Sequence, residues 1–82
     1  MRIKIYTRKN CIQCYATKKA MEGRNVDIEM ISLDDHPEAA DSLRELGFRQ
    51  LPVVITDNES WCGFRPDMIN RVCAAGHQRV YL

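Results

Sequence analysis

The chain has 82 residues and a mass of 9.5 kDa, which is the size of one domain. We therefore expect a single domain that covers residues 1–82. Its 45% hydrophobic and 28% charged residues are typical of a folded protein and exclude a disordered tail. A net charge of +1 lacks the basic excess expected of a protein that binds nucleic acid or an anionic membrane. The longest apolar run, 51–55, is too short to span a membrane, and the N-terminus lacks the apolar region of a signal peptide. We therefore expect a cytoplasmic protein.

The spacing of apolar residues predicts seven short elements in the order βαβαββα. Strands are expected at 2–7, 26–31, 52–56 and 60–62, and helices at 11–22, 37–46 and 66–75. A helix that connects two consecutive strands makes those strands parallel, and the later hairpin adds antiparallel strands. The fold class is therefore α/β, with a mixed sheet.

Each predicted helix has recognisable end signals. Asn10 is a good N-cap for the first helix, and Gln13 completes a capping-box pattern. Gly23, Gly47 and Gly76 are expected to end the three helices in turn. The second helix is expected to begin near a proline and to bury one apolar face. That face would hold Ala39, Ala40, Leu43 and Leu46.

Four cysteines in a chain expected to be cytoplasmic point to redox chemistry, a metal or buried small side chains. Cys11 and Cys14 lie three residues apart at the start of a predicted helix, a spacing at which a disulfide closes with little backbone movement. Unpaired N–H groups and the positive dipole end there favour a thiolate. We expect Cys11 to be the exposed, low-pKa nucleophile and Cys14 the resolving thiol. Residues 1–24, which contain this pair, hold seven basic residues and one acid.

The other candidate residues have less specific interpretations. A zinc site would need further ligands from Cys62, Cys73, His36 or His77, and their spacing fits no common zinc motif. Cys73 lies on an apolar helical stripe and is expected to be a buried small residue, whereas Cys62 is either a packed thiol or a third thiol near the site. The two histidines are expected at the surface. Trp61 and Phe64 belong either to the core or to a recognition surface.

Several segments resemble the NrdH-redoxins, glutaredoxin-like proteins of the thioredoxin superfamily. They are Ile5-Tyr6-Thr7, Cys11-Ile12-Gln13-Cys14, Ala16-Thr17-Lys18, residues 47–54 and Trp61-Cys62-Gly63-Phe64-Arg65-Pro66-Asp67. The last segment is the most specific, since it resembles the family signature W-S-G-F-R-P-D. Cys62 stands where the family usually has serine, so this chain departs from the signature by one additional thiol.

The resemblance implies a four-stranded mixed sheet flanked by three helices, with Pro52 as a cis-proline facing the dithiol. It implies a thiol–disulfide oxidoreductase that donates electrons to the large subunit of class Ib ribonucleotide reductase and is reduced by thioredoxin reductase. No bound cofactor is implied, because NADPH and FAD belong to the reductase, and no metal site is expected. A monomer is expected. The implied partner-binding residues are Ile12, Gln13, Leu51, Pro52, Trp61, Gly63, Phe64 and Arg65, beside catalytic Cys11 and Cys14.

Three alternatives remain at this point. The first is a glutathione-dependent glutaredoxin, against which bulky Phe64 and Pro66, which has no N–H donor, both argue. In that interpretation they would replace parts of a glutathione-binding turn. The second is a general protein disulfide reductase. The third is an iron–sulfur carrier, which would need the same glutathione site.

Overall fold

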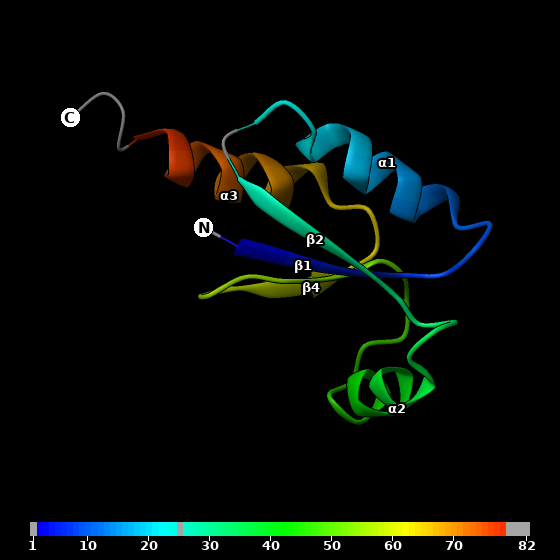
Figure 1. Ribbon diagram of the computed structural model, residues 1–82. Helices are drawn as coiled ribbons and strands as arrows, with labels where there is room; N and C mark the ends of the chain where they lie inside the picture. The colour runs from blue at the N-terminus through cyan, green and yellow to red at the C-terminus, as the bar shows by residue number, and fades with distance from the viewer. Residues whose placement is uncertain (1, 25, 79–82) are drawn as a thin grey trace.

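The computed structural model describes residues 2–24 and 26–78, with side-chain surroundings described as far as Cys73. All seven elements lie in the predicted order (Figure 1). Their bounds are β1 Arg2–Thr7, α1 Ile12–Met21, β2 Asp27–Ser32, α2 Pro37–Glu45, β3 Val53–Ile55, β4 Ser60–Cys62 and α3 Pro66–Gln78. The strands form one sheet in the order β2-β1-β3-β4. β1 and β2 are parallel, and the other two pairs are antiparallel, which confirms the mixed four-stranded sheet with three helices.

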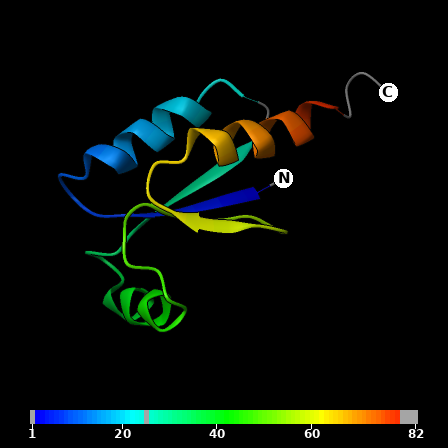
Figure 2. The ribbon, with the colours of Figure 1, turned by 180° about the vertical axis from the view of Figure 1, so that it is seen from behind.

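The sheet separates two apolar clusters, because α1 and α3 cover one face and α2 covers the other (Figures 1 and 2). Ile3 and Ile5 alternate with exposed residues along β1 and are fully buried against α1 and α3. On β3, Val54 joins that cluster and the preceding Val53 joins the cluster under α2. This alternation is the period of two that a strand imposes on successive side chains.

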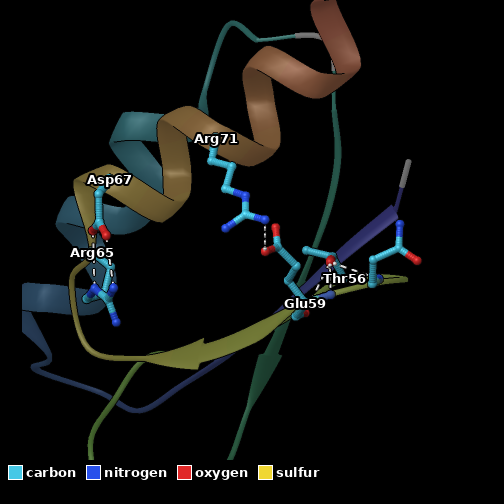
Figure 3. A network of polar contacts seen from close by, with 6 residues as sticks. Thr56, Glu59, Arg65, Asp67 and Arg71 are labelled. Carbon is cyan, nitrogen blue, oxygen red and sulfur yellow. Dashed lines mark hydrogen bonds and ion pairs between the residues drawn. The ribbon is translucent and has the colours of Figure 1, made fainter.

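A charged contact ties α3 to the β3–β4 hairpin (Figure 3). Arg71 Nη2 lies 3.3 Å from Glu59 Oε1. Thr56 closes the hairpin beneath this pair, since its Oγ1 accepts from the Glu59 N–H at 2.9 Å and donates to the Glu59 carbonyl at 3.1 Å. The hairpin and the last helix are therefore held together near the start of β4, at the opposite end of that strand from the β4–α3 turn.

Three expectations about the helices were wrong. Asn10 is not the N-cap of α1, because Cys11 takes that position and Asn10 has a left-handed φ of 59°. α3 continues past Gly76 to Gln78, since a helix tolerates glycine at a cost of about 1 kcal/mol. Leu46 follows the last residue of α2 and is 69% exposed, so it is not on the buried face. Gly23 and Gly47 do follow their helices, each with positive φ.

Among the described residues, no helix is both long and apolar enough to cross a membrane.

Candidate active site

The site is built on a disulfide between Cys11 and Cys14 at the first turn of α1. The Cα atoms of these two residues are 5.2 Å apart, within the range a disulfide prefers. Cys11 Sγ also accepts a hydrogen bond from the Cys14 N–H at 3.1 Å, so a site sulfur is itself the helix N-cap. Cys11 is half-buried, whereas Cys14 is only 4% exposed. The more accessible sulfur is thus the one expected to attack, and the buried one is placed to resolve.

A buried hydroxyl fixes the first turn that carries the dithiol. Thr17 is fully buried, and its Oγ1 donates to the Gln13 carbonyl at 2.9 Å. The Tyr15 N–H donates to the Cys11 carbonyl at 3.1 Å, which closes the first α-helical hydrogen bond. The peptide units between the two cysteines are therefore held by the helix and not by an open loop.

A groove runs from the dithiol to the loop before β3. It is lined by Asn10, Cys11, Ile12, Gln13, Arg49, Gln50 and Leu51. The Leu51–Pro52 peptide bond is cis, as the resemblance implied. The Gly63 N–H donates to the Pro52 carbonyl at 2.8 Å and so joins the β4–α3 turn to the cis-proline. The structure therefore places Ile12, Gln13 and Leu51 in the groove that Cys11 also lines. Pro52 is connected by its carbonyl to Gly63.

A second hollow adjoins the dithiol on the side of β2 and is mostly apolar. It is lined by Thr7, Arg8, Asn10, Cys11, Ile12, Cys14, Tyr15, Lys18 and Met30. Ile12 is 85% exposed there and Tyr15 is 61% exposed, with Met30 less so. Sequence patterns missed Tyr15 and Met30, since a lone aromatic on a helix and an apolar residue on a strand are ordinary core signals. Their exposure becomes visible only when β2 is placed at the edge of the sheet.

The turn between β4 and α3 separates the residues of the signature segment. Trp61 is 4% exposed and packs in the cluster under α1 and α3, so its place is in the core and it does not form part of an open binding surface. Phe64 is 40% exposed beyond Gly63. The expectation that both aromatic residues bind a partner is therefore corrected for Trp61, because alternation along β4 turns its ring inward.

Arg65 makes a two-point contact with the carboxylate of Asp67 in the first turn of α3 (Figure 3). Its Nε lies 3.1 Å from Oδ1 and its Nη2 lies 2.9 Å from Oδ2. Hydrogen bonding from the guanidinium is the main cause that holds the pKa of the Asp67 carboxyl below its ordinary value. The same contact raises the pKa of Arg65. Both side chains are therefore already engaged by each other at the helix start.

Neither of the free cysteines nor His36 lines the two hollows that contain the dithiol. Cys73 is 3% exposed in the core, which confirms its packing role, and Cys62 is half-buried against the cluster under α2. His36 is exposed, and the side chain of His77 lies outside the described residues. Within the part of the chain that the structure describes, no group of three or more His, Cys, Asp or Glu side chains is placed to hold a metal ion.

A thioredoxin-type sheet with a dithiol at the N-terminus of its first helix defines a thiol–disulfide redox protein. The glutaredoxin family profile matches residues 3–61. The glutaredoxin-like protein NrdH of Escherichia coli K12 is 65% identical over 94% of this chain and 95% of its own length. The NrdH protein of Lactococcus lactis IL1403 is 31% identical over 85% of this chain and 97% of its own.

A solved structure gives the same result. The NrdH-redoxin of Escherichia coli, a protein described as having a thioredoxin-like activity profile, has a TM-score of 0.83 at 67% identity. The match covers 88% of this chain and 95% of the other. The chain therefore belongs to the glutaredoxin family and, within it, to the NrdH glutaredoxin-like redox proteins.

Proposed function

We propose that this protein donates electrons to class Ib ribonucleotide reductase and is reduced by thioredoxin reductase at the expense of NADPH. The observation that carries the proposal is the Cys11–Cys14 disulfide, with its half-exposed first sulfur and buried second sulfur at a helix N-terminus. The similarity to NrdH proteins supports the choice of partners. In this role the protein serves deoxyribonucleotide synthesis in the cytoplasm as a monomer. It holds no cofactor of its own, since NADPH and FAD are bound by the reductase.

The reaction is two successive thiol–disulfide exchanges. The Cys11 thiolate attacks one sulfur of a disulfide on the tail of the large subunit, and the other sulfur leaves as a thiolate that takes up a proton. Cys14, as a thiolate, then attacks Cys11 Sγ and displaces the remaining sulfur of the tail. Two electrons have passed from the dithiol to the tail, and the Cys11–Cys14 disulfide seen in the structure is the product. Thioredoxin reductase returns it to the dithiol.

The residues at the start of α3 support thioredoxin reductase, and not glutathione, as the electron source for this protein. A carboxylate in the first turn of this helix is the natural partner for the amino group of a bound peptide, but Asp67 is already paired at two points with Arg65. Phe64, a bulky residue that is 40% exposed, stands in the turn between β4 and α3, and Pro66 supplies no N–H to a ligand carboxylate. An apolar surface with an internally satisfied ion pair favours contact with a protein.

The deciding experiment follows NADPH consumption during reduction of a protein disulfide with two alternative electron sources. Thioredoxin reductase should support rapid turnover of wild-type protein, and glutathione with glutathione reductase should support little. Cys11→Ser serves as the control in both arms and should show no turnover. Equal turnover from the two sources would overturn the choice of reductase. Failure of the reduced protein to restore activity to class Ib ribonucleotide reductase would overturn the choice of acceptor.

A further inference from the structure

Two glutamine side chains from distant parts of the chain meet above one glycine beside the dithiol. Gln13 lies between the two cysteines on α1, and Gln50 comes just before Leu51 in the loop that leads to β3. A methyl group placed on the Gly63 Cα would lie 2.7 Å from Gln50 Oε1 and 3.7 Å from Gln13 Oε1. Gly63 is buried with a φ of +80°, so the β4–α3 turn brings bare backbone against both carboxamides.

Both carboxamides are left with unused hydrogen-bonding capacity. Within the described residues, neither Gln13 nor Gln50 makes a side-chain hydrogen bond, although each offers two N–H donors and a carbonyl acceptor. Both residues are exposed and line the groove that contains Cys11. Polar groups with no partner in the protein are available to a ligand at no cost in broken internal contacts.

The backbone beside these side chains is also unpaired. Leu51 lies outside β3, and none of the hydrogen bonds of the described residues uses its N–H or its carbonyl. The groove thus presents a peptide edge at Leu51 and two carboxamides that approach Gly63, and Cys11 lines the same groove. A peptide backbone has the donors and acceptors that match such an edge.

We propose that Gln13 and Gln50 bind the backbone amides of a disulfide substrate next to its reacting cysteine. This rests on the proposed function and deepens it, because it assigns the side chains that bind the substrate backbone beside Cys11. Each carboxamide donates to a substrate carbonyl and accepts from a substrate N–H. A small disulfide without a peptide backbone offers no amide N–H or carbonyl to these groups. The two glutamines are therefore specificity residues for peptide disulfides, and the bond-making sulfurs remain those of Cys11 and Cys14.

The test uses pre-reduced protein in single-turnover exchange, without either proposed protein partner. One probe is a blocked peptide with an intramolecular Cys-Gly-Gly-Cys disulfide, and the other is bis(hydroxyethyl) disulfide. The observed rate is followed against probe concentration to give a maximal rate and a half-saturating concentration. The variants are Gln50→Met and Gln13→Met, which keep the side-chain length and remove the hydrogen bonds. Asn58→Ala removes an exposed carboxamide at the β3–β4 turn and is the control.

Each glutamine variant should raise the half-saturating concentration of the peptide about threefold to tenfold, the loss expected for one or two neutral hydrogen bonds. The ratio of maximal rate to half-saturating concentration should fall more for the peptide than for bis(hydroxyethyl) disulfide, because no sulfur has been changed. Unchanged peptide binding, or an equal loss on both probes, would overturn the proposal. Absence of exchange by wild-type protein would instead contradict the proposed function.

Discussion

The backbone N–H of Cys14 donates to the sulfur of Cys11 at 3.1 Å, so the residue expected to attack is also the residue that caps its own helix. We expect the same N–H to face Cys11 Sγ when the disulfide opens, because α1 holds the Cys14 N–H in place. A thiolate there gains a donor and the positive end of the helix dipole. A sulfur stabilised in this way is also the better leaving group in the resolving step.

The two cysteines should therefore give opposite results in a trapping experiment. Cys14→Ser leaves the Cys11 thiolate able to attack but removes the group that resolves, so a mixed disulfide with the partner should accumulate. Cys11→Ser should trap nothing, since Cys14 is only 4% exposed. Non-reducing electrophoresis after mixing with oxidised substrate measures the adduct. The reverse pattern would exchange the two assigned roles.

Stability measurements control for damage to the helix cap in this experiment. Serine is a good N-cap and alanine is a poor one, so Cys11→Ala should lose about 1 kcal/mol more unfolding free energy than Cys11→Ser. The comparison is made by urea unfolding under reducing conditions, where no disulfide contributes. Equal stability of the two variants would mean that position 11 does not act as the N-cap of α1.

Local sequence patterns predicted the elements because the forces that set them are local. Alternation in β1 placed Ile3 and Ile5 in the core. The three-residue spacing of the site cysteines likewise predicted that Cys14 lies one helical turn after Cys11. The N-cap was wrong because residue type favours asparagine as a cap, whereas Asn10 has a left-handed φ of 59° and Cys11 Sγ accepts the Cys14 N–H. A helix start can shift by one residue with the backbone conformation of the turn before it, and residue type alone does not fix that conformation.

The groove could be predicted only in part. Gln13 and Leu51 followed from family resemblance, but Gln50 did not, because its approach to Gly63 depends on how the loop before β3 packs on the β4–α3 turn. A glutamine in a loop has no periodic signal, and a contact between positions far apart in sequence leaves none either. The sequence could not decide whether Trp61 lies in the core or at a binding surface, because a tryptophan suits both.

Alanine at Gly63 should separate backbone strain from the contact with Gln50. Gly63 and Gly23 have nearly equal φ values of +80° and +79°, so alanine at either position should cost about 1–2 kcal/mol of stability. Only at Gly63 does the new methyl group meet a side chain, since nothing lies within 4 Å of the position at Gly23. Gly63→Ala should therefore also displace Gln50 and weaken peptide binding, while Gly23→Ala should not. Chemical denaturation and the single-turnover assay measure the two effects.

The two free cysteines should affect stability without affecting turnover. Cys73 is almost fully buried in the core, so Cys73→Ser should lose about 1–3 kcal/mol by burying a hydroxyl. Cys62 is half-buried against the cluster under α2, on the opposite face of the sheet from α1, and Cys62→Ser should lose less. Turnover per folded molecule should stay within about twofold for both variants. A large loss of turnover in Cys62→Ser alone would show that this thiol takes part in the reaction.

The ion pair at the start of α3 should give stability a dependence on acid pH. The Asp67 carboxyl has a lower pKa in the folded chain than its ordinary 3.8, mainly because Arg65 donates two hydrogen bonds to it. Its contribution is therefore fully present above pH 3.8 and is lost as the pH falls through the lower folded value. Asp67→Asn removes the titrating group, so the difference in unfolding free energy between wild type and variant should shrink as the pH falls below that range. Urea unfolding measured across acid pH tests this, with Asp41→Asn, whose carboxylate pairs with Arg44 on α2, as the matched control. A difference between wild type and Asp67→Asn that stays constant down to pH values well below 3.8 would mean that the pair does not stabilise the start of α3.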